Sequence, residues 1–288
     1  MSAEILKGAA LAAEIKEDAA RRTAAFKTRA GRPIRLALIS AQAGAAAQSY
    51  LKARVKAGQS VGIEAGIIPI GTDWTTERLA ALIAGVARDE TTDALIVDFP
   101  LPEAIDAGKI REALPPKKDA EGLSPDSFGR LFLAKRYAEA RRLVVPPTAM
   151  ACAELLRRTG IPLEGRRALV VGRSPVVGRP AAHLLSLLGL TVTLAHSKTQ
   201  DIEQEVRRAD AVVAAAGKAR LVRGAWIKPG AAVIDAGVNQ DGESLCGDVE
   251  FAAAAANASF ITPVPGGVGP VTTACLLANA VLLAESRL

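Results

Sequence analysis

Short apolar segments alternate with longer amphipathic segments along nearly the whole 288-residue chain. Parallel strands need long crossover connections, which helices usually supply, so this alternation predicts parallel sheets covered by helices on both faces. The expected strands are residues 34–40, 65–70, 94–99, 167–171, 191–195, 211–215 and 231–235. The expected helices are residues 6–26, 48–61, 75–88, 179–188, 251–258 and 272–288. The sequence therefore indicates an α/β fold.

The alternation is interrupted between about residues 100 and 150, where proline, lysine and aspartate cluster. The clusters include the segments 114–119 and 145–148. A half-apolar chain of this length can bury two ordinary cores, so we expect a domain junction in this region.

The 75–88 helix should be capped near Thr75 or Thr76, because a threonine hydroxyl can accept a bond from a free amide of the first turn.

Membrane and secretory functions are not expected. The longest apolar run, 274–284, is interrupted by Asn279 and is shorter than the roughly 20 residues that cross a bilayer. The first residues lack the basic and apolar regions of a signal peptide. We therefore expect a soluble, cytoplasmic protein without a membrane partner.

Metal and nucleic-acid chemistry are also not expected. Three well-separated cysteines without CxxC spacing indicate reduced structural thiols, and two isolated histidines give no metal-ligand cluster. The formal charge of +6 is scattered rather than arranged in a basic stripe with aromatics. Such a balance suits a solvated surface or small anionic ligands better than nucleic acid.

A glycine-bearing turn at 170–180 lies between an expected strand and an expected helix. Gly172 would let the chain leave the strand tightly, and Gly178 would permit close approach to a phosphate or to the packed helix. Free amides at the helix start would then face a pyrophosphate. The spacing is G-x5-G rather than G-x-G-x-x-G, so the loop alone is also compatible with a simple tight turn.

The residues after the next strand favour NADP over NAD. Where NAD-binding units place an acid for the ribose hydroxyls, this chain has His-Ser-Lys-Thr at 196–199. No carboxylate stands there to repel a 2′-phosphate. Arg173 could pair with that phosphate as a rigid donor fork, and Ser197 or Lys198 could add donors.

Together with its surroundings, the Gly-Arg-Ser-x-x-Val-Gly-x-Pro loop at 172–180 resembles the cofactor loop of the bifunctional methylenetetrahydrofolate dehydrogenase/methenyltetrahydrofolate cyclohydrolase family. Further segments resemble that family's motifs in the same order: 100–102, 118–122, 226–230, 233–237, 247–249 and the Pro/Gly-rich 261–270. The resemblance implies an N-terminal α/β folate domain, a Rossmann-like NADP-binding domain and a cleft between them. The implied bounds are 1–122 with 272–288, and 140–271.

The resemblance also implies the function and the site residues. The reaction would be NADP-dependent oxidation of methylenetetrahydrofolate, with tetrahydrofolate derivatives as ligands and a homodimer as the usual assembly. The implied cofactor-binding residues are Gly172, Arg173, Ser174, Val177, Gly178, Ser197 and Val238. The implied substrate-binding residues are Tyr50, Glu121, Pro265, Gly266 and Gly267, and the implied catalytic residues are Tyr50, Arg54 and Asp98.

Three positions depart from the family's folate site. Arg54 stands where the family has lysine, Asp98 where it has glutamine, and Glu121 where it has aspartate. Cyclohydrolysis needs a group that can lose a proton near neutral pH, which arginine cannot do, whereas hydride transfer needs no such base. We therefore expect the dehydrogenase reaction to persist and hydrolysis to be weak, absent or run by altered groups. An Arg54–Asp98 pair is also expected.

Alternatives remain at this point. The chain could be fully bifunctional, with Glu121, Asp98 or Tyr50 handling the protons, or it could be a non-catalytic folate- and NADP-binding paralogue. A reductase of another small substrate would leave the Pro/Gly-rich segment unexplained. Further departures at 42–47 and 147–150 bear on substrate detail and leave the hydrophobic pattern intact.

Overall fold

The computed structural model describes residues 2–41, 45–99, 101–242 and 244–288, without the side chains of residues 45–50. The chain forms two compact units. Unit 1 contains residues 1–13, 134–141 and 146–275, and unit 2 contains residues 14–133, 142–145 and 276–288. The chain passes from one unit to the other within two long helices, α1 (Ala9–Ala30) and α11 (Val268–Glu285).

Unit 1 is built on a six-stranded parallel sheet with the order β1-β11-β8-β7-β5-β6. Its strands are β1 (Glu4–Ile5), β5 (Arg167–Val171), β6 (Thr191–Ala195), β7 (Ala211–Ala214), β8 (Ala232–Asp235) and β11 (Phe260–Ile261). The central strands are apolar and buried, as expected for a sheet covered on both faces. The chain leaves β5 toward β6 on one side and continues through β7 and β8 on the other. The carboxyl ends of β5 and β7 therefore form a topological switch point, where such sheets bind ligands.

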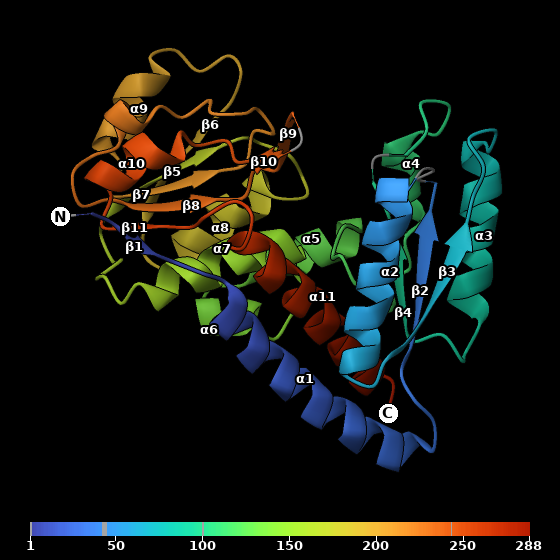
Figure 1. The fold of residues 1–288 in the computed structure, drawn as a ribbon. Coiled ribbons are helices and arrows are strands. Elements are labelled where there is room, and N and C mark those ends of the chain that lie inside the picture. The colour runs from blue at the N-terminus through green and yellow to red at the C-terminus, as the bar shows by residue number, and fades with distance from the viewer. Residues whose placement is uncertain (1, 42–44, 100, 243) are drawn as a thin grey trace. The chain divides into compact units, whose positions relative to one another are not determined.

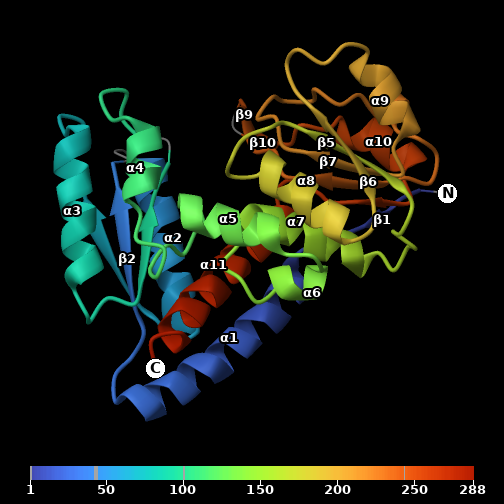
Figure 2. The same cartoon turned by 180° about the vertical axis from the view of Figure 1, so that it is seen from behind.

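Helices cover both faces of this sheet (Figures 1 and 2). On one face lie α7 (Pro147–Arg158) and α8 (Gly178–Leu187), and on the other lie α9 (Ile202–Arg208) and α10 (Phe251–Asn257). A short helix η1 (Gly224–Trp226) packs against α10. A two-stranded hairpin, β9 (Asn239–Asp241) and β10 (Ser244–Cys246), lies outside the main sheet.

Unit 2 is built on a three-stranded parallel sheet, β3 (Glu64–Pro69), β2 (Arg35–Ser40) and β4 (Ala94–Val97), in that order. Its helices are α2 (Ala45–Ser60), α3 (Thr76–Arg88), α4 (Ala107–Ala113) and α5 (Pro125–Leu133). The central β2 packs its apolar side chains with Phe26 of α1 and with the end of α11, including Leu277 and Val281. The last turns of α11 thus complete the core of unit 2.

Most of the predicted elements are present within a few residues. Thr75 caps α3 as predicted, because its hydroxyl accepts a bond from the amide of Arg78. The segment 100–150, for which no helix or strand was predicted, contains α4, α5, α6 (Tyr137–Ala140) and the start of α7. These helices are mostly too short for an apolar period to be visible, and α4 depends on a local cap by Asp106.

The compact units divide the chain differently from the predicted domains. Residues 1–13 join unit 1 because β1 pairs with β11 and the amide of Gly8 donates to the carbonyl of Gly266. Residues 268–275 of α11 also belong to unit 1. A two-residue strand such as β1 carries no periodic signal, so its pairing with β11 could not be predicted from the sequence.

Helix α11 is long and apolar enough to cross a membrane by length and composition. More than half of it is buried within the protein, as in the core helix of a folded domain. Its interrupting polar residue, Asn279, is also buried and donates to the carbonyls of Ala120 and Val145 at 2.8 and 2.9 Å. We therefore interpret α11 as a core helix.

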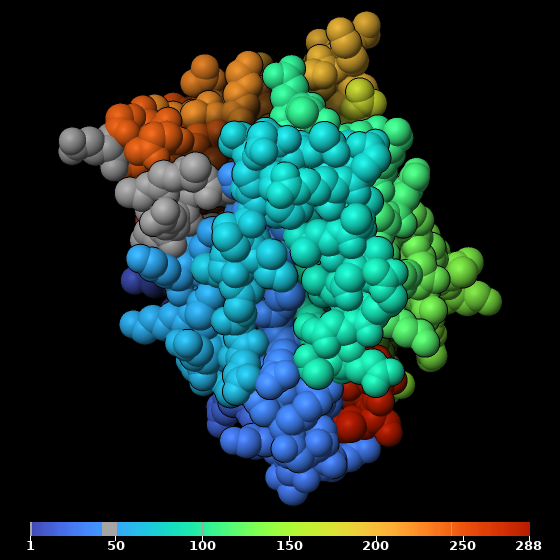
Figure 3. All heavy atoms as spheres, turned by 90° about the vertical axis from the view of Figure 1, so that its right-hand side faces the viewer, coloured from blue at the N-terminus to red at the C-terminus, as the bar shows by residue number. Residues whose placement is uncertain are grey.

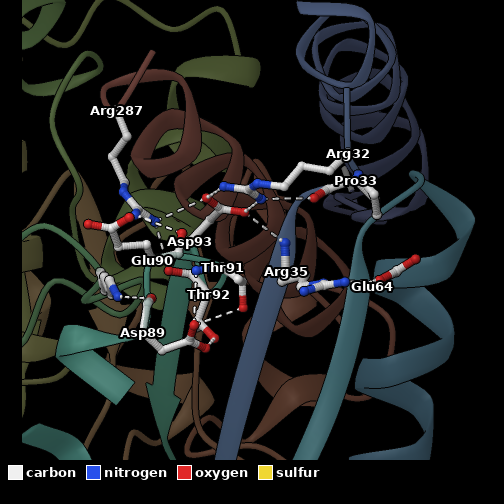
Figure 4. A network of polar contacts seen from close by, with 11 residues as sticks. Arg32, Pro33, Arg35, Glu64, Asp89, Glu90, Thr91, Thr92, Asp93 and Arg287 are labelled. Atoms are coloured by element: carbon white, nitrogen blue, oxygen red, sulfur yellow. Dashed lines mark hydrogen bonds and ion pairs between the residues drawn. The ribbon is translucent and has the colours of Figure 1, made fainter. Parts of the chain in front are cut away.

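A buried carboxylate ties the C-terminus to the sheet of unit 2 (Figure 4). The Asp93 side chain is fully buried and accepts two bonds from the Arg32 guanidinium, at 2.7 and 2.8 Å. It also accepts from the Arg35 amide at 2.9 Å and from Arg287 at 3.1 Å. Arg287 donates further to the carbonyls of Thr92 and Glu90. One acid thus connects the segment before β2, the start of β4 and the chain end.

The outer edge of the unit 2 sheet is exposed. Figure 3 shows the face that carries α2 in blue and α3 in cyan to green, with a groove between them. Strand β3 and the start of β2 line this groove, whose volume is about 390 Å³. Ile67 of β3 is 38% exposed. β3 is thus an edge strand with exposed apolar surface.

Candidate active site

The turn after β5 can be made only with glycine at two positions. Gly172 has a φ of +119°, and a Cβ there would lie 2.2 Å from the carbonyl oxygen of Ala215. A Cβ on Gly178 would lie 1.9 Å from the carbonyl oxygen of Gly172. Both glycines therefore allow close backbone approach where α8 begins, as the sequence predicted.

Ser174 closes this turn onto the helix. Its hydroxyl oxygen accepts the Val177 amide at 3.1 Å and lies 3.5 Å from the Gly178 amide. The side chain therefore acts as a local cap at the start of α8. The amides of the first helical turn, close to the carboxyl end of β5, can then be directed at an anion.

A cavity of about 490 Å³ opens beside this turn. It brings together four of the predicted cofactor residues, which are Gly172, Arg173, Ser174 and Ser197. Val177, Gly178 and Val238 are not among its lining residues, and Val238 is largely exposed. His196 and Thr199 of the predicted 196–199 loop also line the cavity, whereas the wall formed by Ala215, Ala216, Lys218 and Leu221 was not predicted from the sequence. Arg173 and Lys218 give the cavity positive charge suited to a nucleotide's phosphates.

The loop after β6 has a fixed shape. The His196 amide donates to the Thr199 hydroxyl at 2.8 Å, and the Lys198 amide donates to His196 Nδ1 at 3.1 Å. Ser197 and Thr199 line the cavity, whereas Lys198 does not. Of the two donors suggested for a 2′-phosphate in this loop, the geometry therefore favours Ser197.

A buried acid organises the loop after β8. Asp235 accepts the amides of Gly237, Asp248 and Val249 at 2.9 to 3.0 Å. Burial raises the pKa of Asp235 to about 6, against the lowering effect of those amide bonds. A Cβ on Gly247 would lie 1.9 Å from the Asp235 carboxylate, which explains the glycine there. The 233–237 and 247–249 motifs therefore contact each other through the Asp235 carboxylate.

The Pro/Gly-rich segment forms a tight turn before α11. Pro265 and Gly266 are exposed, Gly267 is buried, and the Val264–Pro265 peptide bond is cis. Gly266 has a φ of +102°, and a Cβ on Gly267 would lie 2.6 Å from the carbonyl oxygen of Pro263. These residues present backbone rather than side chains at the surface of unit 1.

In unit 2, two of the three predicted catalytic residues, Arg54 and Asp98, lie together at the carboxyl ends of the strands. Ser40 ends β2, Asp98 follows β4, and Arg54 projects from α2. Arg54 Nη1 lies 3.2 Å from Asp98 Oδ1, and the Ser40 hydroxyl donates to Asp98 Oδ2 at 3.2 Å. The predicted Arg54–Asp98 pair is thus confirmed.

Glu121 joins this cluster. Its Oε1 lies 3.9 Å from Arg54 Nη2, and its side chain is only 16% exposed, so it is not a surface acid. Arg54 therefore neutralises only one of two neighbouring carboxylates. When Asp98 and Glu121 are both ionised, the three side chains carry a net charge of about −1. Burial raises the pKa of Glu121 to about 7, opposed by Arg54 and reinforced by Asp119 and Asp98. Burial also raises the pKa of Asp98, against the effects of Arg54 and Ser40.

Nearby lysines do not replace the missing one. Lys52 is exposed on α2, and Lys118 donates to the carbonyls of Val86 and Asp89 at 2.8 and 2.6 Å. Lys118 therefore caps the end of α3, a role that its motif did not reveal. The Tyr50 side chain lies outside the described residues, as does the segment 42–44, so its predicted role stays a prediction.

Comparison with known proteins also divides the chain into two parts. The family model for the tetrahydrofolate dehydrogenase/cyclohydrolase catalytic domain matches residues 6–121. The model for the NAD(P)-binding domain of that family matches residues 146–288. Together they cover almost the whole chain.

Full-length relatives agree. The chain is 43% identical over 287 residues to the bifunctional protein FolD of Elusimicrobium minutum, covering 99% of this chain and 100% of that one. It is 36% identical to the FolD methylenetetrahydrofolate dehydrogenase/cyclohydrolase structure from Campylobacter jejuni, with a TM-score of 0.92 over 100% of both chains. The Trypanosoma brucei FolD structure, in complex with NADP and an inhibitor, is 36% identical with a TM-score of 0.91 over 100% and 99% of the chains.

Proposed function

The chain belongs to the tetrahydrofolate dehydrogenase/cyclohydrolase family, and on that premise we propose that it is an NADP-dependent methylenetetrahydrofolate dehydrogenase. The product would be 5,10-methenyltetrahydrofolate. The observation that carries the proposal is the cavity beside the Gly172 turn, where Arg173 and Ser197 stand in place of an acid. The direct test is NADPH formation when purified protein is given NADP and methylenetetrahydrofolate.

The residues present fit NADP. Gly172 lets the turn approach the backbone of Ala215 closely, because a Cβ there would clash with it. The amides at the start of α8 can bind a pyrophosphate, and the planar guanidinium of Arg173 can bind a phosphate. Bound NADP would supply the hydride acceptor. The protein's own contribution is to hold the two ligands in contact and exclude water, because the folate nitrogen drives hydride departure.

We propose that hydrolysis of the methenyl product is weak or absent. Arg54 replaces the lysine that would exchange protons with water, and a guanidinium stays protonated throughout the accessible pH range. This guanidinium bonds to Asp98 at 3.2 Å and lies 3.9 Å from Glu121. A second candidate function, full bifunctionality, is favoured by one observation, which is that Glu121 has a pKa of about 7.

Cofactor choice gives the first prediction. Arg173→Ala should raise the KM for NADP roughly 10- to 100-fold, because it removes a charge-assisted contact with the 2′-phosphate. The KM for NAD should change less than about threefold, since NAD lacks that phosphate. Steady-state kinetics with both nucleotides measures the ratio. Equal losses for NADP and NAD would remove Arg173 from 2′-phosphate recognition.

Substrate binding should depend on pH through Glu121. A pterin amide and amino edge offers two donors, which an ionised carboxylate can accept and a protonated carboxyl cannot. Since the pKa of Glu121 is raised to about 7, the ionised fraction grows between pH 6 and 8. The KM for methylenetetrahydrofolate should therefore fall roughly tenfold over that range, while the KM for NADP stays flat.

The Glu121 prediction has an internal control. Asp98→Asn removes the surplus negative charge, so it should move the midpoint of the pH profile to lower pH. A folate KM that is independent of pH in the wild-type protein would exclude Glu121 as the titrating ligand group.

We also propose that the protein is cytoplasmic and forms a homodimer, the assembly usual in the family. The exposed edge strand β3 supports this, because a second copy could cover its apolar surface. Light scattering on the purified protein should give about twice the 29.8 kDa chain mass. A monomeric mass at micromolar concentration would contradict the dimer.

A further inference from the structure

One buried carboxylate, Asp248, gathers the loop that follows β7. Its Oδ2 accepts the amides of Ala216 and Gly217 at 2.6 and 2.8 Å, and its Oδ1 accepts the amide of Lys218 at 2.9 Å. Asn239 Nδ2 adds a fourth donor at 2.9 Å. Asp248 is fully buried, so all its acceptor positions face protein donors rather than water.

Asp248 is itself held in place. Its amide donates to Asp235 at 3.0 Å, and Asp235 also accepts the amides of Gly237 and Val249. A Cβ on Gly237 would lie 2.2 Å from the Asp248 carboxylate. The two acids therefore form a rigid support for the loop. The close contact of Gly237 with the Asp248 carboxylate shows that the residues around this support are tightly packed.

The loop held by Asp248 forms a wall of the nucleotide cavity. Ala215, Ala216 and Lys218 line that cavity together with Arg173. Ala215 is also the residue against which Gly172 packs so closely that no Cβ would fit. The position of the loop therefore sets the distance between the glycine turn and the facing wall.

We propose that Asp248 is a positioning residue for cofactor binding, holding residues 216–218 so that Lys218 faces the phosphates of NADP as a second cation beside Arg173. The inference rests on the proposed function, because it takes NADP as the occupant of this cavity. A mobile loop would carry the Lys218 ammonium away from the phosphates, and ordering it on binding would cost affinity. The Asp248 carboxylate removes that cost before the cofactor arrives.

One substitution tests whether Asp248 holds the loop, and another tests whether the charge of Lys218 contributes to NADP binding. Asp248→Asn keeps the shape but replaces one acceptor by a donor, which would then face backbone amides that also donate. Lys218→Met keeps the length of an exposed side chain and removes its charge, so it should leave folding intact. Each should raise the Kd for NADPH at least about tenfold, measured by the fluorescence change on binding.

The matched control is Asp210→Asn. Asp210 also accepts a backbone amide, from Arg167 at 2.9 Å, and pairs with Lys228 at 2.7 Å. It lies by the start of β5, the opposite end of the strand from the cavity. This variant should bind NADPH within about twofold of the wild-type protein, even if its thermal stability falls as much as that of Asp248→Asn.

The outcomes separate this inference from the proposed function. Weaker NADPH binding in both variants, with an unchanged KM for methylenetetrahydrofolate, supports the proposal, since general loss of structure would move both constants. Wild-type affinity in Lys218→Met or in a folded Asp248→Asn protein overturns it. Failure of the wild-type protein itself to bind NADPH would overturn the proposed cofactor.

Discussion

Replacing Arg54 with lysine, Asp98 with glutamine and Glu121 with aspartate in one protein is expected to increase methenyltetrahydrofolate hydrolysis roughly 10²- to 10⁴-fold, the usual contribution of a general acid–base group. A lysine in a partly desolvated site can release its proton near neutral pH, which arginine cannot. NADPH formation should change by less than about tenfold, because hydride transfer depends on holding the ligands rather than on a base.

The single variant Arg54→Lys shows whether the arginine alone, or also its two acidic neighbours, limits hydrolysis. Asp98 and Glu121 would both remain beside the ammonium and would stabilise its charged form. The single variant should therefore gain much less hydrolysis than the triple variant. A triple variant that still forms NADPH but hydrolyses no faster than the wild-type protein would show that Arg54 does not limit hydrolysis.

Asp93→Asn should lower the free energy of unfolding by about 3 kcal/mol, the scale found when one partner of a buried ion pair is removed. The fully buried Asp93 carboxylate accepts from Arg32, Arg287 and the Arg35 amide (Figure 4). Asparagine would leave these donors facing a neutral group with one acceptor fewer. The two guanidinium groups are partly exposed and can turn to water, which keeps the cost at the lower end of that scale.

Urea titration measures this change, and Asp18→Asn is the matched control. Asp18 pairs with Arg21 and Arg22 on the exposed surface of α1, so its loss should cost less than about 1 kcal/mol. Equal destabilisation by the two substitutions would mean that the buried network contributes no more than a surface pair.

The sequence predicted the fold well wherever an element was long enough to show a period. Strands β5 and β6 match their predicted ranges, because β5 is mostly a buried apolar run and β6 is rich in β-branched threonine and valine. β1, β11 and α6 span two to four residues and could not be recognised. Their places follow from tertiary pairing, as between β1 and β11.

Within the site, prediction succeeded for residues that could be aligned with a family motif, and it failed for contacts between loops that are distant in the sequence. Arg54 and Asp98 could be paired because the motifs place a permanent cation and a new acid in the same pocket. Lys118 belongs to an equally recognisable motif, yet its amine bonds to carbonyls about 30 residues away. The support that Asp248 gives to residues 216–218 likewise depends on a tertiary contact that no local spacing reveals.

The central claim is that the chain retains the dehydrogenase reaction and has lost lysine-based hydrolysis. The most direct measurement follows the decay of methenyltetrahydrofolate absorbance with purified protein and no nucleotide, beside NADPH formation from methylenetetrahydrofolate by the same preparation. We predict rapid NADPH formation, with methenyl decay at the rate seen in buffer alone. Methenyl decay accelerated by the protein to a rate comparable with NADPH formation would contradict the claim.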